Sequence, residues 1–202
     1  MDIKDAIRTR RSIRSYSDKA VSLEDVADIL EIARFTPSSG NQQNWKVIVV
    51  TDEKLRVELA KVSKKQDWMG FAPVHLVVCN EYAGISKMFK ELGKMFSIQN
   101  CAALATNIIN LAHAQGFGTC WVGSFPADTV KRVLSLPDEG IDPEVIITLG
   151  YPAKEELKEQ ERKEIFDFSY FDSWGKTDAS FRSVSFFGGL KEKLFKKKEV
   201  SE

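Results

Sequence analysis

Four short runs rich in β-branched residues alternate with helical segments, and this alternation most constrains the fold of the chain. The runs predicted as strands are WKVIVVT from Trp45, PVHLVVCN from Pro73, GTCWVGSF from Gly118 and EVIITLGYP from Glu144. Helices are predicted near 2–10, after Ser22, near 53–64, over 84–115 and over 126–135. Strands and helices in this order predict a layered domain of the α/β or α+β class.

Two of the predicted helices carry local signals. Ser22 followed by Asp25 resembles a capping box in which aspartate replaces the usual glutamate. The second half of the 84–115 helix reads SIQNCAALATNIINLAHAQG, which is apolar almost all round and ends near Gly116. Such a helix is expected to lie buried at the centre of the fold or at a subunit contact.

The 202 residues suit one domain, predicted over 1–175 with a C-terminal arm, followed by a tail over 176–202. Lysine plus arginine equals aspartate plus glutamate at 29 each, so the chain has no net positive charge that would favour binding of nucleic acid. The start of the chain has no leader pattern, which predicts a cytoplasmic protein without a membrane partner. For the closing LKEKLFKKK, a solvated terminal helix is favoured over a helix that touches a membrane.

The cysteines and histidines do not predict a metal site. Three cysteines lie in apolar stretches, which favours reduced and buried thiols, and two histidines stand alone without a ligand-spaced partner. We therefore expect no catalytic metal.

The segment RTRRSIRSY, which directly follows the first short helix, gathers Arg10, Arg11, Ser12 and Arg14. Guanidinium groups donate paired, charge-assisted hydrogen bonds and a serine hydroxyl adds another, a combination that suits a phosphate. The alternative is a solvated basic turn, because clustered arginines are common on protein surfaces.

A second polar segment, TPSSGNQQNW over 36–45, places turn-forming and amide residues before a tryptophan. It could be an exposed turn before the first strand, with Gly40 ending a helix. It could equally supply hydrogen bonds to a ligand beside the aromatic ring.

Several catalytic architectures are excluded. Gly116 and Gly118 lie between a helix and a strand, whereas a classical dinucleotide fingerprint requires strand, glycine turn and helix in that order. The chain has no nucleophile elbow and no P-loop. Polar segments that could grip a ligand, without evident catalytic side chains, indicate that a bound cofactor supplies the reactivity.

Four motifs, in order over essentially the whole chain, resemble those of the FMN-dependent nitroreductase family. They are RRSIRSY, TPSSGNQQNW, AQGFGTCWVGSF, and GYPAK followed by ERKEIF. The resemblance implies a nitroreductase-like fold, in which a central, mainly antiparallel sheet is flanked by helices. It also implies a homodimer with two FMN sites at the interface and a C-terminal arm that extends onto the partner subunit.

The same resemblance implies roles for individual residues. The FMN phosphate would be held by Arg10, Arg11, Ser12, Arg14 and Arg162. The flavin would be reached from the other subunit by Pro37, Ser38, Ser39 and Asn41. Gln66 would contact the ribityl chain or the pyrimidine edge, and the backbone near Gly123 and Ser124 would face flavin N5 and O4. Arg14 is also the candidate for stabilising the negative charge of the reduced flavin.

The implied activity is reduction of electron-poor acceptors, such as nitroaromatics or quinones, with NADH or NADPH in a ping-pong hydride transfer. No side chain is assigned as catalytic. Two alternatives stay open: a flavin-binding sensor or carrier without general turnover, and a relative with specialised chemistry such as reductive dehalogenation.

The chain departs from the family pattern at two positions. Asn44 stands where the family usually has proline, so the turn into Trp45 lacks the restraint of the ring. Gln160 stands where some members have a second basic residue, which removes one phosphate contact. Residues 65–95 align poorly with the family and are expected to form the region that varies with the acceptor.

Overall fold

The computed structural model of the chain describes residues 1–64, 66–153 and 160–178. Its contacts divide the chain into two compact units, 1–156 and 157–202. Within its described part, the second unit contains one short 3-10 helix, η4 (Ile165–Asp167). The strands and α-helices described below all belong to the first unit.

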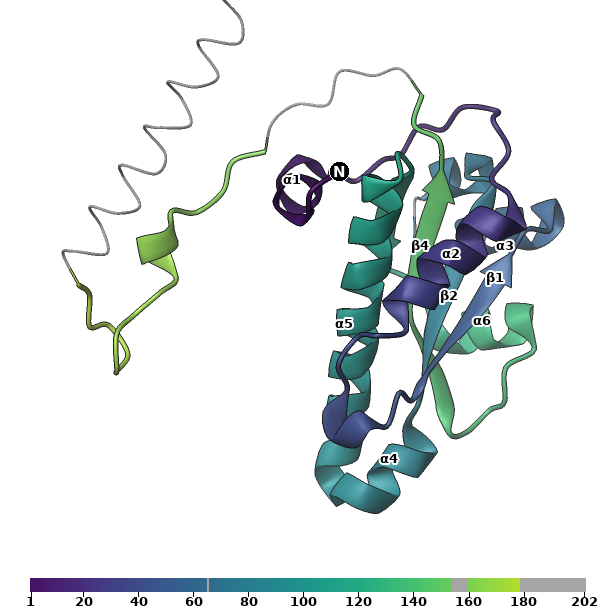
Figure 1. The fold of residues 1–202 in the computed structure, drawn as a ribbon. Coiled ribbons are helices and arrows are strands. Elements are labelled where there is room, and N and C mark those ends of the chain that lie inside the picture. Colours follow the sequence, from purple (N-terminus) through teal and green to yellow (C-terminus); the bar gives the residue numbers. More distant parts are fainter. Residues whose placement is uncertain (65, 154–159, 179–202) are drawn as a thin grey trace, which may run out of the picture. The chain divides into compact units, whose positions relative to one another are not determined.

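A four-stranded sheet forms the middle of the first unit (Figure 1). Its strands are β1 (Trp45–Val50), β2 (Val74–Glu81), β3 (Gly118–Val122) and β4 (Ile141–Gly150). They lie in the order β1-β2-β4-β3, and each neighbouring pair is antiparallel. The predicted antiparallel sheet is therefore confirmed, with β1 and β3 at its two edges.

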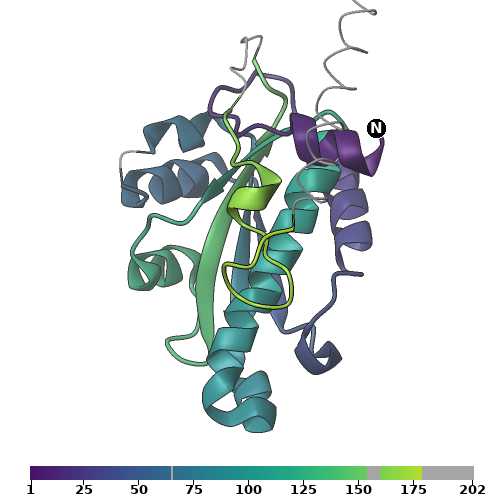
Figure 2. The ribbon, with the colours of Figure 1, turned by 90° about the vertical axis from the view of Figure 1, so that its left-hand side faces the viewer.

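Helices cover both faces of the sheet. They are α1 (Ile3–Thr9), α2 (Leu23–Ala33), α3 (Glu53–Val62), α4 (Tyr82–Phe89), α5 (Gly93–Ala114) and α6 (Ala127–Leu134). Figure 2 shows the sheet between α5 with α1 and α2 on one side and α3 with α6 on the other. This layered α+β arrangement agrees with the prediction from the sequence.

Two apolar cores fill the spaces between these layers. On one face, Leu104 and Ile108 of α5 pack with Ile29 of α2 against Leu76 and Ile147 of the sheet. On the other face, a second core joins Leu59 of α3 and Val130 of α6 to Val77 and Ile146. Neighbouring strand residues alternate between the cores because successive side chains point to opposite faces. Among the described residues, no helix is both long and apolar enough to cross a membrane.

The single helix expected over 84–115 is two helices in the structure. The chain breaks after α4, where Lys90 has a φ of 49°, and α5 begins at Gly93. A Cβ atom at position 93 would lie 2.5 Å from the Cα of Ser86, so only glycine lets α4 fold back this closely. The prediction was wrong because helical periodicity does not reveal such a close approach.

The predicted helix ends are confirmed at two positions. Ser22 Oγ accepts a hydrogen bond from Asp25 N at 3.0 Å, and the Asp25 carboxylate accepts one from Ser22 N at 3.2 Å. Gly116, just beyond α5, has a φ of 88°, the left-handed conformation typical of a helix C-terminus. Both features follow from local chemistry that the sequence alone displays.

His75 is a fully buried titratable residue in the middle layer. Its Nε2 lies 2.8 Å from the Met69 carbonyl oxygen, while Nδ1 has no partner in the described ranges. Burial lowers the pKa of His75 to about 4; the Met69 hydrogen bond opposes the shift and the charge of Arg56 adds to it. The folded protein therefore holds a neutral imidazole at a pH where the unfolded chain would bind a proton.

This pKa predicts a loss of stability in mild acid. Between pH 6.5 and 4 the unfolded state binds the proton and the folded state does not, so stability falls as the pH decreases. The loss over this window is up to about 3 kcal/mol. Urea unfolding at pH 7 and pH 4.5 should show a smaller difference for His75→Phe than for the wild type. An equal pH dependence in the two proteins would contradict the assignment.

Candidate functional site

The arginine-rich segment runs from the end of α1 along the outer edge of β3. Ser12 bridges Thr119, and Ile13 N donates a hydrogen bond of 2.9 Å to the Thr119 carbonyl. Further on, the Tyr16 hydroxyl lies 2.8 Å from the Ile13 carbonyl oxygen and 2.6 Å from Thr148 Oγ1. The segment is thus attached to the sheet at both ends, which fixes the backbone that carries Arg14.

The structure brings the predicted arginines and serine together. Burial raises the pKa of the Cys120 thiol, and Arg14, the Ser12 hydroxyl and Arg10 all oppose that shift, so the three groups lie near this sulfur. Burial lowers the pKa of His113 at the end of α5, and the positive charges of Arg10 and Arg11 lower it further. The segment therefore carries a local excess of positive charge in a chain with no net charge.

None of the three guanidinium groups has a carboxylate partner within the part of the chain that the structure describes. Arg11 donates from Nη1 to the carbonyl oxygens of Arg8 and Arg10, at 2.8 and 2.9 Å. Arg10 has no ion pair there, and the Arg14 guanidinium lies 5.8 Å from the centre of the Trp68 ring. Clustered arginines without acidic partners are suited to bind an anion.

The outer edge of β3 continues from this cluster toward Gly123 and Ser124. Backbone groups of alternate residues in a strand point to the same edge. Because the Thr119 carbonyl faces the arginine segment, the N–H group of Trp121 faces that edge too, and β3 ends at Val122 directly before Gly123. Beyond Thr119 this edge has no strand partner within the described residues. Ser124 lies five residues after Thr119, two of them beyond the end of β3, so the two residues are at most about 17 Å apart.

Gln66 lies beside the arginine cluster, although the two are distant in sequence. Its Oε1 accepts a hydrogen bond of 2.8 Å from the indole Nε1 of Trp68, whose ring contacts Arg14. Trp68 is not among the residues predicted from the sequence. A tryptophan two residues after a predicted ligand-binding glutamine was the signal that could have identified it.

The polar segment 36–45 adopts a compact loop with an unusual backbone. Gly40, Asn41 and Gln43 have φ values of 57°, 55° and 45°, in the left-handed region. Gln43 N donates to Ser38 Oγ at 3.0 Å, and Gln43 Nε2 donates to Asn41 Oδ1 at 3.1 Å. Non-glycine residues in this region cost of order 1–3 kcal/mol each and persist only where the surroundings fix them.

The surroundings that fix the loop are polar side chains on α5. The Asn44 side chain hydrogen-bonds to Ser97 and Asn100, Ser39 bonds to Asn100, and Asn107 donates to Thr36 Oγ1 at 2.6 Å. The expectation of a helix that is apolar almost all round was therefore wrong along this polar stripe. The spacing of Ser97, Asn100 and Asn107, by three and seven residues, places them on one helix face and could have revealed it.

The loop and the arginine cluster lie near opposite ends of α5. Ser39 bonds to Asn100, whereas Thr9 Oγ1 at the end of α1 lies 2.8 Å from His113 Nε2. Thirteen helical residues separate these contacts, a distance of about 20 Å along the axis. Within one chain, the structure therefore does not bring Pro37, Ser38, Ser39 and Asn41 to the predicted phosphate group.

Arg162 belongs to the second unit, where only its local contacts are described. The guanidinium donates to the Glu161 carbonyl oxygen through Nη1 and to Gln160 Oε1 through Nη2, both at 3.0 Å. Gln160, which replaces a basic residue of some family members, thus holds the neighbouring arginine. The role of Arg162 toward a phosphate stays a prediction.

Close packing of Ile13 against Gly118 predicts that Gly118→Ala destabilises the fold. A Cβ atom at position 118 would lie 2.7 Å from Ile13 Cγ1 and would push the arginine segment away from β3. Such overpacking typically costs about 1–3 kcal/mol, measurable as a lower free energy of unfolding in urea. Gly123→Ala is the matched control, because its Cβ would meet only Trp121 Nε1 at 3.6 Å. Equal stability of the two variants would contradict the packing argument.

Comparison with known proteins connects this geometry to a family. The sequence profile of the Nitroreductase family matches residues 7–66 and 57–151. A Methanothermobacter thermautotrophicus protein, provisionally named NADH dehydrogenase/NAD(P)H nitroreductase, is 35% identical over 158 residues, 76% of this chain and 79% of the relative. An FMN reductase [NAD(P)H] of Bacillus subtilis is 26% identical over 167 residues, covering 76% and 67% of the two chains.

A solved structure agrees in fold. The NADPH:FMN oxidoreductase from Vibrio harveyi, complexed with NAD+, superposes with a TM-score of 0.78 at 20% identity, covering 91% of this chain and 82% of that one. With an antiparallel sheet between helical layers and the family profile matched over most of its length, the chain belongs to the nitroreductase family.

Proposed function

We propose that the chain is an FMN-dependent oxidoreductase that uses NADH or NADPH to reduce small, electron-poor acceptors such as nitroaromatics or quinones, and that it acts as a homodimer. One observation carries this proposal. Arginines without a carboxylate partner among the described residues lie at one end of the open edge of β3, and the exposed residues Gly123 and Ser124 follow its other end, at most about 17 Å from Thr119. An elongated cofactor with a phosphate at one end and a flat ring at the other matches this arrangement.

The donors at the arginine end fit the FMN phosphate. Arg10, Arg11 and Ser12 supply charge-assisted and hydroxyl hydrogen bonds to phosphate oxygens, and Arg162 is a further proposed donor. Thr119 Oγ1 is buried beside this segment without a hydrogen-bond partner in the described residues, and so can also serve a ligand. The positive charge that lowers the pKa of His113 also favours a bound dianion.

At the ring end, the chain contributes orientation and electrostatics. The backbone at Gly123 and Ser124, two exposed residues, would face the N5 and O4 edge of the flavin, and Gln66 would contact its ribityl or pyrimidine part. Arg14 supplies the positive charge near N1 and O2. When bound, FMN would supply the hydride-transfer chemistry between the nicotinamide and the acceptor, so no acidic side chain is required next to it.

The names of the relatives support this assignment. The Bacillus subtilis relative is an FMN reductase that uses NAD(P)H, and the Vibrio harveyi structure is an NADPH:FMN oxidoreductase. Both names contain FMN and a reduced nicotinamide cofactor, which are the two cofactors that we assign to this chain. Oxidation of NAD(P)H with a quinone present would distinguish this function from a flavin-binding protein without turnover.

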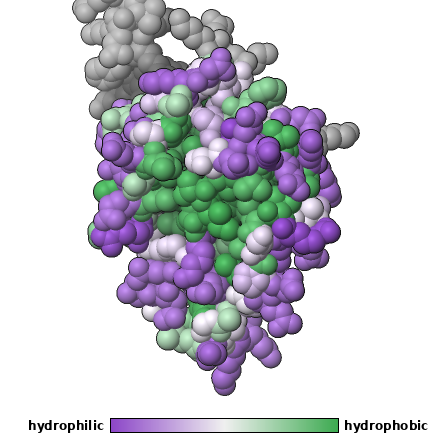
Figure 3. Space-filling view, turned by 90° about the vertical axis from the view of Figure 1, so that its right-hand side faces the viewer, coloured by the Kyte–Doolittle hydropathy of each residue, from purple (hydrophilic) through white to green (hydrophobic). Residues whose placement is uncertain are grey.

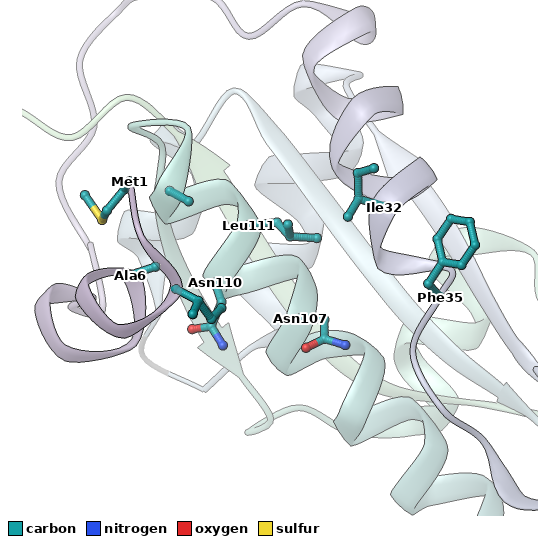
Figure 4. A pocket seen from close by; sticks show the side chains of 9 residues that line it. Met1, Ala6, Ile32, Phe35, Asn107, Asn110 and Leu111 are labelled. Atoms are coloured by element: carbon teal, nitrogen blue, oxygen red, sulfur yellow. The ribbon is translucent and has the colours of Figure 1, made fainter.

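Two apolar surfaces of the first unit support a dimer. Figure 3 shows apolar side chains gathered across the face at the β1 edge, where Ile48, Leu55 and Val133 line a hollow of about 400 Å³. Figure 4 shows a second hollow, of about 340 Å³, over α5 between α1 and α2, where Ile32 and Phe35 are exposed. Exposed apolar patches of this kind are typical of protein interfaces.

Arg14→Ala should weaken FMN binding. Removal of one or two charged hydrogen bonds, worth about 1.5–3 kcal/mol each, raises the dissociation constant about tenfold or more. Fluorescence titration of the apoprotein measures this change. Arg34→Ala is the control, because Arg34 is an exposed residue directly after α2 that pairs with Glu31. Wild-type protein that stays colourless with excess FMN would refute the proposed function.

A mixed dimer tests whether loop 36–45 serves the flavin of the other subunit. One subunit would carry Arg10→Ala and Arg14→Ala, and the other Asn41→Gly, which removes the side chain without straining the left-handed backbone. If the loop acts across the interface, each mixed dimer isolated with two affinity tags contains one complete site and recovers about half of the wild-type activity. Mixed dimers whose activity is only the mean of the two parent homodimers would show that the loop acts within its own chain.

A further inference from the structure

A buried group of amide and hydroxyl side chains fastens loop 36–45 to α5. Asn44 is only 6% exposed, and its Oδ1 accepts a hydrogen bond of 2.7 Å from Asn100 Nδ2. Its own Nδ2 donates to Ser97 Oγ, and Ser97 is fully buried. We call Asn44, Ser97 and Asn100 the amide clamp.

The amide clamp holds both ends of the left-handed part of the loop. Besides bonding to Asn44, Asn100 accepts two hydrogen bonds at its Oδ1, from Ser39 N at 3.0 Å and from Ser39 Oγ at 3.2 Å. The backbone of Asn44 also accepts from Glu81 N at 2.9 Å. One helical side chain therefore connects the residue before Gly40 with the residue that leads into β1.

This attachment differs in kind from the restraint that a proline would give. A pyrrolidine ring fixes only the φ angle of its own residue. The Asn44 amide instead ties the loop to a particular turn of α5, so the loop takes its position from the helix. Gly40 packs closely against α4, because a Cβ atom at position 40 would lie 3.1 Å from the Phe89 ring and 3.2 Å from Met88 Sδ. This contact fixes the remaining side of the loop.

We propose that Asn44 is a positioning residue, which through Asn100 and Ser97 sets how Ser38, Ser39 and Asn41 face the flavin of the second subunit. This inference rests on the proposed function, because it requires a flavin for the loop to face. Asn44 itself is buried, and its side chain is bonded to Ser97 and Asn100 of α5. Its effect on the site passes through the backbone of the loop, which the amide clamp holds in a left-handed conformation that would otherwise relax.

The test compares Asn44→Ala with Ser22→Ala in the full-length, FMN-loaded protein. Ser22→Ala removes the N-terminal cap of α2 and lowers stability without touching the loop. Asn44→Ala leaves buried partners on α5 unsatisfied, and we expect the KM for the acceptor to rise about tenfold with kcat changed much less. The visible absorption and circular dichroism of bound FMN should shift in Asn44→Ala and match the wild type in Ser22→Ala.

A double variant separates positioning from stability. In Asn44→Leu with Asn100→Leu, the two amides that bond to each other both become apolar groups of similar shape. Neither then leaves the other unsatisfied, so part of the thermal stability should return, although Ser97 and Ser39 lose a partner. The flavin spectrum and the acceptor KM should stay altered, because Ser39 has lost its anchor.

Two results would overturn the inference. If Asn44→Ala lowers only the melting temperature, and its flavin spectrum and acceptor KM equal those of Ser22→Ala, then Asn44 has a merely structural role. The proposed function survives that result. Wild-type protein that binds no FMN would instead remove the proposed function, and this inference with it.

Discussion

Burial of α5 against the antiparallel sheet is the constraint on which the rest of the structure depends. The helix supplies much of one core through residues such as Leu104 and Ile108, and its two ends hold segments that are distant in sequence. Asn100 binds the polar loop in its first half, and His113 contacts the end of α1 in its last turn. The helix thus keeps two parts of the candidate site at a fixed separation of about 20 Å.

The other edge of the site depends on a close contact between backbone and side chain. Gly118 begins β3 and leaves room for Ile13, whose backbone pairs with Thr119. Because Arg10, Arg11 and Arg14 flank that pairing, their charges gather at the start of an open strand edge. A neutral chain can therefore present a strongly positive site, since the charges are concentrated by topology and not by composition.

Much of the fold could be predicted from the sequence because its signals are local. The β-branched runs became the strands, Ser22 formed its capping box, and Gly116 adopted a left-handed conformation after α5. The break between α4 and α5 could not be predicted, since it depends on the contact of Gly93 with Ser86. The polar stripe of α5 was missed for a related reason: Ser97 and Asn100 satisfy loop groups that are distant in sequence.

The candidate site was also predictable only in part. The arginine segment and Gln66 do lie together, because Trp68 contacts both Arg14 and Gln66. This role of Trp68 could be recognised only from the folded structure. The separation of loop 36–45 from those arginines within one chain is a property of the tertiary structure that no motif states. The roles assigned to Gly123, Ser124 and Arg162 toward a cofactor stay predictions.

Because α5 sets the distance between two attached segments, insertions have different consequences in this helix and in the connecting turns. One residue inserted between Asn100 and His113 would turn the ends of the helix relative to each other by about 100° and lengthen it by about 1.5 Å. Either the loop or the arginine segment would then lose its hydrogen-bond partner. Insertions in the turn between α6 and β4 meet no such restriction, because that turn lies between elements and closure of a longer loop costs little. Changes in length should therefore be tolerated in the connecting turns and excluded from this one helix.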